Sequence, residues 1–262
     1  MKMPVLFIGH GSPENIILKN SFTERLVKLG QELTRPEIIL VVSAHWLTHG
    51  TYVSCVERPK TIYDFYGFPD ELYQVKYPCP GSPEVAKLTT EIAKKPAVKC
   101  DYAWGLDHAS WAILKHIYPK ADIPVIEMSL DYSPYNDWKR PSLQYFYDLA
   151  KQLTPLRDRG VLIIGSGNIV HNLRVADMNM DAPPYEWAVE FDEKVKRDLL
   201  SRNHKALIEC DDMSRVTSLS VPTLDHYLPM IFAIGLQQEE PLEFIYEGFQ
   251  NRSVSMRCFK VG

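Results

Sequence analysis

The chain has 262 residues, of which 45% are hydrophobic and 24% charged, and its formal net charge is −4. These values lie near the averages of folded globular proteins, so they exclude a disordered or fibrous chain. The slight negative charge, without a long basic stretch, argues against nucleic acid or an anionic membrane as the main partner.

The first residues and the cysteines both bear on the cellular compartment. The start, MKMPVLFIGHGSP, lacks the long apolar core and small-residue cleavage site of a secretory signal. No apolar run approaches the roughly 20 residues that cross a bilayer. The scattered, unpaired spacing of the cysteines predicts free thiols in a reducing cytoplasm, and neither a disulfide framework nor a cysteine zinc site. The cysteines are Cys55, Cys79, Cys100, Cys210 and Cys258.

The first part of the chain alternates between apolar runs and a helical pattern. Residues 4–8 (PVLFI) and 38–43 (IILVVS) are continuous apolar runs, as expected of strands covered on both faces. Between them, Ser21-Phe22-Thr23-Glu24 has the pattern of a capping box and predicts a helix to about residue 33. Residues 52–56 could form a third strand.

A long irregular segment then precedes two further helices. Residues 59–83 are rich in Pro, Gly, Tyr and Phe, and such stretches inside compact domains are often functional. Ser82 and Pro83 are typical of an N-cap and a first helical position, so a helix should run to about residue 95. Another helix should begin near residue 109. The aromatic side chains of the irregular segment could line a pocket or pin the segment on the core: Tyr63, Phe65, Tyr66, Phe68, Tyr73 and Tyr77.

The second half continues the alternation. Residues 124–130 and 161–165 are predicted strands, with a helix over 137–153 between them. The amphipathic segment 186–203 predicts another helix, and the alternating residues 254–259 predict an edge strand. Strands separated by helices indicate a single α/β domain over the whole chain, residues 1–262, with a largely parallel central sheet flanked by helices.

Histidines follow several of the predicted strands. His10 directly follows the first strand, His45 the second, and His171 comes shortly after the strand at 161–165. Ligands bind outside the carboxyl ends of strands in open α/β sheets, so these side chains could converge on a metal ion. His226 stands at an expected helix start. Imidazoles from separate strand ends suit Zn, Fe, Cu or Ni in a catalytic site that keeps a position open.

An ordinary structural role competes with the ligand role for every histidine. Single histidines are more often hydrogen-bonded or surface residues than ligands. We assign this ordinary role to His49, His116 and His204, which lie in polar or helical settings without a motif. For His10 and His45, each taken alone, the two roles are equally open, and their matching positions after consecutive strands favour the ligand role.

His108 lies near the start of a predicted helix, in an aromatic setting. A helix N-terminus lowers the pKa of a histidine, which would suit a neutral imidazole in acid–base or hydrogen-bonding work. A helix-capping Asp107 beside a packed histidine is an equally good interpretation.

Two glycine clusters, at residues 9–13 and 165–168, could cradle a phosphate or let the backbone approach a ligand. They lack the GxGxxG and P-loop spacings, which makes a phosphate cradle a weak interpretation. Neither has the GxSxG spacing, which argues against a serine hydrolase of that type.

A series of short motifs, in order along most of the chain, resembles a known family. The set resembles the class III (LigB-type) extradiol ring-cleaving dioxygenases and is most similar to their 4,5-DOPA dioxygenase branch. The motifs are Gly9-His10-Gly11-Ser12-Pro13, Ser43-Ala44-His45-Trp46, Asp64-Phe65-Tyr66-Gly67-Phe68-Pro69, Tyr77-Pro78 with Pro80-Gly81-Ser82-Pro83, Gly105-Leu106-Asp107-His108, Ser166-Gly167-Asn168 with Val170-His171-Asn172-Leu173-Arg174, and Asp225-His226-Tyr227-Leu228-Pro229.

The resemblance implies an α/β fold with one divalent metal ion at the strand ends. It implies that His10, His45 and His226 are metal ligands, and that His171 is a fourth ligand or the acid–base residue. It also implies that His108 is a second catalytic histidine, which hydrogen-bonds the substrate or oxygen.

The third metal ligand is the open point, because two candidates are neighbours. Many non-haem Fe(II) oxygenases use two histidines and one carboxylate. The matching segment here offers both Asp225 and His226. The resembling branch has histidine at this motif, so we expect His226 to bind and Asp225 to support it or face the substrate. An all-histidine site would bind Zn(II) readily, so we expect Zn(II) as a bound ion and Fe(II) as the active form.

The function that the resemblance implies is oxygen-dependent opening of a catechol ring. A substrate such as L-DOPA would give a muconic semialdehyde of the 4,5-seco-DOPA type, with both atoms of O2 incorporated. The expected partners are thus a small catechol and O2, with no nucleic acid and no membrane, in a monomer or a homodimer. The alternatives are a zinc-dependent hydrolase on a related scaffold and a non-catalytic, Memo-like binding protein.

Overall fold

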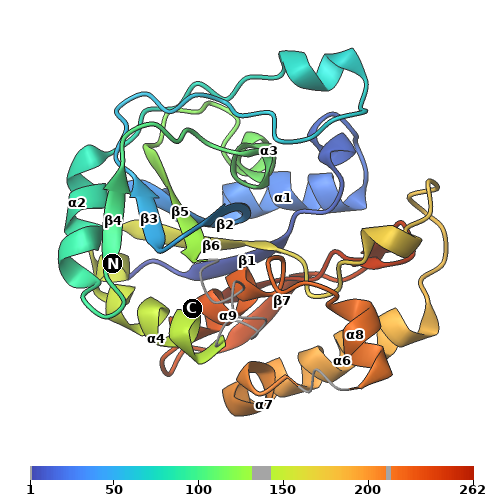
Figure 1. Cartoon of the computed structure of the whole chain (residues 1–262). Coiled ribbons are helices and arrows are strands. Elements are labelled where there is room, and N and C mark those ends of the chain that lie inside the picture. The colour runs from blue at the N-terminus through green and yellow to red at the C-terminus, as the bar shows by residue number, and fades with distance from the viewer. Residues whose placement is uncertain (1, 132–142, 211–213) are drawn as a thin grey trace.

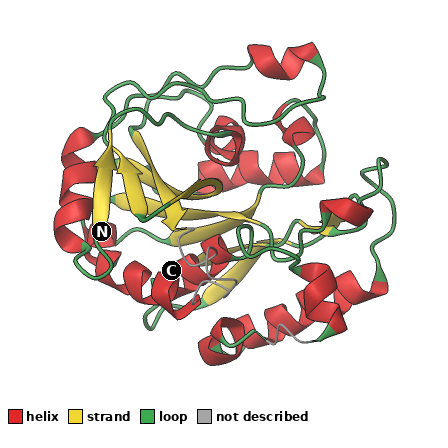
Figure 2. Cartoon of the chain, in the orientation of Figure 1, coloured by secondary structure: helices red, strands yellow, loops and turns green. Residues whose placement is uncertain are grey.

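The computed structural model describes residues 2–131, 143–210 and 214–262. Its centre is an eight-stranded sheet with helices on both sides (Figures 1 and 2). The strands of this sheet are β1 (Val5–Gly9), β2 (Ile38–Thr48), β3 (Thr51–Ser54), β4 (Val98–Asp101), β5 (Val125–Asp131), β6 (Val161–Gly167), β7 (Leu242–Tyr246) and β10 (Cys258–Val261).

The strand order is β4-β3-β5-β2-β6-β1-β10-β7. Neighbours are parallel at β3/β4, β2/β5, β2/β6 and β1/β6, and antiparallel at β3/β5, β1/β10 and β7/β10. The predicted α/β fold with a largely parallel central sheet is therefore confirmed. The carboxyl ends of β1, β2, β5 and β6 lie at the same edge, which positions the site described below.

Two hydrophobic cores lie on the two faces of the sheet. In β1, Val5 and Phe7 join one core, and Leu6 and Ile8 join the other. Successive side chains of β1 point to opposite faces of the sheet, and both faces are covered, so every residue of β1 is buried. This explains its continuous apolar run.

The helices cover both faces. Helices α1 (Ser21–Glu32) and α3 (His108–Ile117) pack on one side, and α4 (Leu143–Leu153) and α9 (Leu228–Gly235) on the other (Figure 1). The remaining elements are η1 (Pro13–Ile16), η2 (Asp70–Gln74), α2 (Pro83–Ile92), α5 (Pro155–Asp158), η4 (Leu173–Val175), α6 (Glu186–Leu200), α7 (His204–Ile208), α8 (Arg215–Ser220), β8 (Phe249–Gln250) and β9 (Val254–Ser255). Among the described residues, no helix has both the length and the apolar content to cross a lipid bilayer.

The helix starts follow the predicted capping chemistry with one shift. The predicted capping box at Ser21 is wrong by one residue, because Asn20 caps α1. Its side chain accepts from the Thr23 amide and Thr23 Oγ1 accepts from the Asn20 amide, both at 3.0 Å. The predicted Ser82 cap of α2 is confirmed, and α2 ends at Ile92. Of the predicted helix over 137–153, residues 137–142 lie outside the described part.

The predicted edge strand over residues 254–259 is wrong, because the chain breaks there into two strands. β9 pairs with β8 in a separate ribbon, and β10 lies inside the main sheet between β1 and β7. Arg257 stands at the break, where its guanidinium is buried against the Asp192 carboxylate. The alternating sequence pattern over residues 254–259 thus includes Arg257, which belongs to neither strand.

The prediction that all cysteines are free thiols is wrong for one pair. Cys55 and Cys100 form a disulfide with a Cα–Cα distance of 5.4 Å. They lie at neighbouring parallel strands, since Cys100 is in β4 and Cys55 directly follows β3. A separation of 45 residues gives no local spacing signal. Within the described part of the chain, Cys79, Cys210 and Cys258 take no part in a disulfide.

Candidate metal centre

Five histidines meet at the carboxyl ends of the parallel strands. His10 directly follows β1, and His171 follows β6 after a short segment. His108 is the first residue of α3, and His226 stands just before α9. His45 belongs to β2, which continues beyond its predicted end. The predicted convergence of His10, His45 and His171 is therefore present, and it includes His108 and His226.

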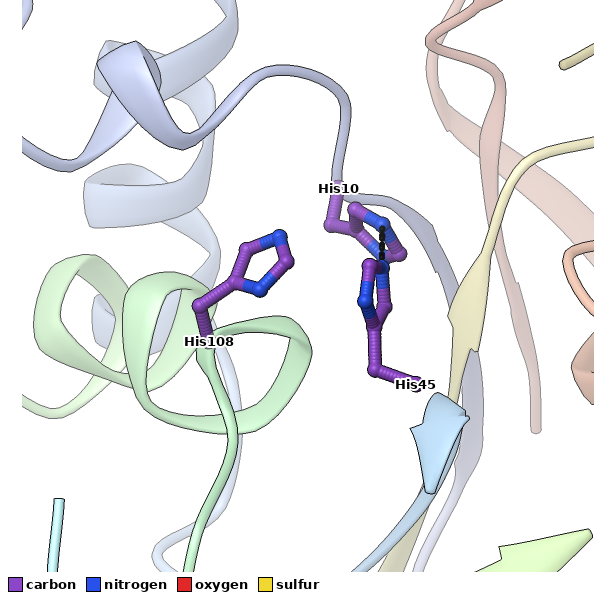
Figure 3. Close-up of side chains that lie close together, drawn as sticks. All are labelled: His10, His45 and His108. Carbon is purple, nitrogen blue, oxygen red and sulfur yellow. Dashed lines mark hydrogen bonds between the residues drawn. The ribbon is translucent and has the colours of Figure 1, made fainter. Parts of the chain in front are cut away.

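An irregularity in β2 accompanies the position of His45. The pairing of β2 with β5 shifts register between Val42 and Leu47. Such irregularities re-aim side chains at functional edges of sheets. His45 lies within this segment and turns toward His10 (Figure 3).

The rings are close enough to share one small ion. The Nε2 atoms of His10 and His45 face each other at 3.3 Å, and His108 points toward the same space (Figure 3). One ring nitrogen from each of these three histidines lies within 4.8 Å of the other two. The ring centroid of His226 lies 5.3 Å from that of His10 and 5.0 Å from that of His45. His171 stacks on His226 with a centroid distance of 3.5 Å.

The hydrogen bonds of His10 determine which of its nitrogens carries the proton. Ser166 Oγ donates its only proton to the Ala109 carbonyl at 2.6 Å. It must therefore accept from His10 Nδ1–H, which lies 3.1 Å away. His10 Nε2 is left with a lone pair that points into the cluster.

Asp64 imposes the same arrangement on two other histidines. Its Oδ2 accepts from Nδ1–H of His45 at 3.0 Å and of His108 at 2.9 Å. Its Oδ1 accepts from the His108 amide at 2.9 Å, so Asp64 also satisfies a free amide at the start of α3. Asp107 stands at the N-cap position, but its side chain does not cap the helix and instead accepts from Ser43 Oγ at 2.6 Å. The alternative of a capping Asp107 is thereby excluded.

Asp225 orients His226. His226 Nδ1–H donates to Asp225 Oδ2, which places the lone pair on Nε2. That Nε2 atom is buried and has no hydrogen-bond partner among the described residues. An unpaired buried nitrogen is costly, and a metal ion is one group that would satisfy it.

The segment that carries His226 can approach the sheet because two residues of β6 are glycines. A Cβ at Gly165 would lie 2.2 Å from the Pro229 carbonyl oxygen, and one at Gly167 would lie 2.2 Å from the His226 oxygen. The Asn168 amide donates to the same His226 oxygen at 2.9 Å. From the sequence, this glycine cluster could let the backbone approach a ligand. In the structure, the two glycines let the segment around His226 and Pro229 approach β6.

Burial sets the charge of most of the cluster. Burial, with the positive charges of neighbouring histidines, holds the pKa of His10 well below its usual value. Burial and the charge of His45 lower the pKa of His108 to about 4. Burial also lowers the pKa of His226, and lowers that of His171 well below its usual range. The predicted direction for His108 is confirmed, with burial as the first cause. Neutral imidazole is the form that binds a metal.

His45 is the exception. Burial would lower its pKa, but the hydrogen bond to Asp64 and the negative charges of Asp107 and Asp64 outweigh burial and raise the pKa. The same contacts hold the pKa of Asp64 below its usual value, against the effect of burial. Without a metal, a proton on His45 would relieve the close approach of the two Nε2 atoms.

No role is predicted from the sequence for Asp64 or Ser166, although both lie in motifs that carry the family resemblance. Asp64 stands in the long segment 59–83, whose length was its only local signal. Most of the aromatic side chains of this segment pack on the core, as Phe65 and Tyr77 do, whereas Tyr66 is 91% exposed. Phe65 also packs on His108, with ring centroids 5.5 Å apart.

The chain is similar to known ring-opening dioxygenases. Residues 4–258 match the family described as the catalytic LigB subunit of aromatic ring-opening dioxygenase. A 4,5-DOPA dioxygenase extradiol of Escherichia coli (strain K12) is 42% identical, and the alignment covers 100% of this chain and 95% of that protein. One of the same name from Mirabilis jalapa is 35% identical over 90% of this chain and 87% of its own. A crystal structure of an uncharacterized protein of Escherichia coli K12 has a TM-score of 0.84 and 38% identity, with both chains fully covered.

Proposed function

Because the chain belongs to the LigB family of aromatic ring-opening dioxygenases, we propose that it opens the ring of a catechol such as L-DOPA beside the two hydroxyl groups. In this reaction the bond between a hydroxyl-bearing carbon and its outer neighbour breaks. Each of these carbons gains one oxygen atom from O2, so no further oxidant or reductant is needed. The product is a muconic semialdehyde of the 4,5-seco-DOPA type.

The observation that carries the proposal is the set of inward-facing Nε2 lone pairs. His10, His45 and His226 would hold the metal through these atoms. Each has its Nδ1 proton engaged by a different partner, namely Ser166, Asp64 and Asp225. Such partners fix the tautomer and orientation of metal-binding histidines. Asp225 is better suited to orient His226 than to bind, because His226 already occupies its carboxylate.

When bound, a divalent metal would supply a Lewis acid for the catechol oxygens and, as Fe(II), a redox centre that Zn(II) cannot provide. We propose Fe(II) as the active form and Zn(II) as an ion that the same nitrogens also hold.

Two neutral histidines would handle protons and orient the substrate. His171 is only half-buried and stacks on His226. Its ring is therefore accessible to a hydroxyl group of a catechol that enters from solvent. Its low pKa keeps Nδ1 or Nε2 free to accept that proton at neutral pH. His108 is held by Asp64 through Nδ1, so its Nε2 can accept a hydrogen bond from the substrate. Distance alone would also allow His108 as the third ligand, and the motif match favours His226.

The test is anaerobic loading followed by oxygen measurement. Metal-free protein would be loaded with Fe(II), with Zn(II) or with nothing, and then supplied with L-DOPA, protocatechuate or caffeate in aerated buffer. We expect the Fe(II) form alone to consume O2, one molecule for each L-DOPA, and to form a yellow product. The exposed His49→Ala variant should behave as the unchanged chain does. Absence of O2 uptake with every catechol would overturn the proposal, and hydrolysis by the Zn(II) form without O2 would replace it.

A further inference from the structure

The histidine cluster has an open side and a closed side. The side chains of His45, Asp64 and Asp225 are 23%, 18% and 18% exposed, respectively. His10 and His108 are both only 4% exposed. A catechol must therefore reach the cluster from the side of His45, Asp64 and Asp225.

A small cavity lies on the closed side, between η1, α1 and α3. It borders His10 and His108 and has a volume of about 10 Å³. Much of its wall is apolar, formed by Phe22, Leu26, Ala112 and Ile113. A void of this size holds about one water-sized molecule, so a catechol cannot occupy it.

A larger cavity opens on the surface at the ends of α1 and α3. Its volume is about 390 Å³, and Val27, Leu33 and Ile117 are among its apolar lining residues. Of the described residues, His116 alone lines both cavities. His116 thus borders both the surface cavity and the inner cavity.

Two of the polar residues that line the inner cavity, Asn15 and His116, are engaged by other protein groups. His116 Nε2–H donates to the Asn15 carbonyl at 2.8 Å. The Asn15 amide group donates to Gln250 Oε1 at 2.8 Å, and Asn15 Oδ1 accepts from Gln250 Nε2 at 3.1 Å. These groups are therefore not available to bind a water molecule, and the apolar part of the wall suits a small apolar gas.

We propose that the surface cavity, His116 and the inner cavity form an access path for O2, separate from the side on which the catechol binds. The proposal rests on the proposed oxygenase function, because only that reaction needs a diatomic gas at the cluster. O2 is apolar and close to water in size, so it fits this path where a catechol does not. A path on the closed side would let O2 arrive after the catechol has covered the open side.

The first experiment detects O2 in the cavity without any catalysis. Methyl resonances of the Zn(II)-loaded protein, which is diamagnetic, would be recorded under N2 and under O2. We expect paramagnetic broadening of the Leu26, Ala112 and Ile113 methyls, and little broadening of Leu149 in the core on the other face of the sheet. Equal broadening at all four residues would overturn the proposal.

The second experiment narrows the path. Ala112→Leu from α3 and Leu26→Phe from α1 place extra volume in the inner cavity from opposite walls. For each variant we expect kcat/KM for O2 to fall by about three- to tenfold, while kcat at saturating O2 and KM for L-DOPA stay unchanged. The control is Ala97→Leu on the exposed surface, which should change none of these values. Thermal unfolding would verify that each variant is folded.

The outcomes separate the path from the chemistry. An unchanged kcat/KM for O2 in both cavity variants, or a rise in KM for L-DOPA instead, would overturn the access path. If the unaltered Fe(II) protein consumes no O2 with any catechol, the proposed function fails, and the methyl broadening still decides whether O2 enters the cavity.

Discussion

The five clustered histidines differ from His116 and His204 in what their ring nitrogens contact. His204 Nδ1 lies 3.0 Å from the Tyr147 hydroxyl, and its Nε2 lies 2.9 Å from Gln237 Oε1. His116 Nε2 donates to a backbone carbonyl. In the cluster, by contrast, His226 Nε2 has no partner among the described residues, and the Nε2 atoms of His10 and His45 face each other.

This difference separates a structural histidine from a candidate ligand. All of these rings are at least half-buried, so burial does not distinguish them. In His204 both nitrogens are satisfied by the protein, as expected for its predicted ordinary role. In the cluster the Nδ1 atoms of His10, His45, His108 and His226 are satisfied, and their Nε2 lone pairs are directed at one another, an arrangement that a cation stabilises.

The largest effect should come from removing a proposed ligand. We expect His10→Ala, His45→Ala and His226→Ala each to lose the bound metal and to reduce O2 uptake with L-DOPA to background. The exposed His49→Ala variant should keep both. Metal content by atomic emission and O2 uptake would be measured on the same samples. A His226→Ala protein that keeps its metal, beside a His108→Ala protein that loses it, would assign the third ligand to His108.

A smaller effect is expected at His171, which stacks on a proposed ligand. We expect His171→Gln to lower kcat by about 10²- to 10⁴-fold, the usual contribution of an acid–base residue, and to retain the metal. The readout is the pair of kcat and metal content, with His49→Gln as the control. Loss of metal in His171→Gln would make His171 a fourth ligand.

Acid should destabilise the cluster in the metal-free protein. The pKa of His108 is about 4 when folded and about 6.5 when unfolded, so below pH 6.5 the unfolded chain takes up a proton that the folded chain refuses. The stability linked to His108 is present above pH 6.5 and is lost as the pH falls to 4, by roughly 3 kcal/mol in total.

The measurement for this prediction is urea unfolding between pH 7.5 and pH 4.5. We expect His108→Gln to lose less stability over this range than the unaltered chain, because glutamine does not titrate. The matched His49→Gln variant should keep the original dependence. Parallel pH curves for His108→Gln and the unaltered chain would contradict the assigned cause.

The sequence predicted those parts of the fold that local pattern determines. The continuous apolar runs of β1, β2 and β6 follow from burial on both faces. β4 and β7 were missed because only Val98 of β4 is buried and no residue of β7 is. These are the two edges of the sheet, where pairing on one side alone leaves a weak pattern.

The candidate site likewise has one part that the sequence predicts and another part that it does not. The convergence of His10, His45 and His171 was predictable from strand ends, because the sheet brings those ends together. The role of Asp64 was not, since its bonds to His108 span 44 residues of chain and depend on how the segment 59–83 folds back. Its sequence neighbours carry no sign of that contact.

The smallest expected effect tests whether the structural histidines are independent of the site. His204→Ala removes two hydrogen bonds, to Tyr147 and Gln237, and should lower the free energy of unfolding by about 1–2 kcal/mol. His49→Ala, at an exposed position, should change it by less than about 0.5 kcal/mol. Urea unfolding and O2 uptake with L-DOPA would be measured for both.

Activity of the folded His204→Ala protein should be unchanged, because both ring nitrogens of His204 bond to the protein and leave no lone pair for the metal. A fall in kcat without loss of metal would show that the packing around α7 and α9 reaches the cluster through His226, and the two groups of histidines would then not be independent.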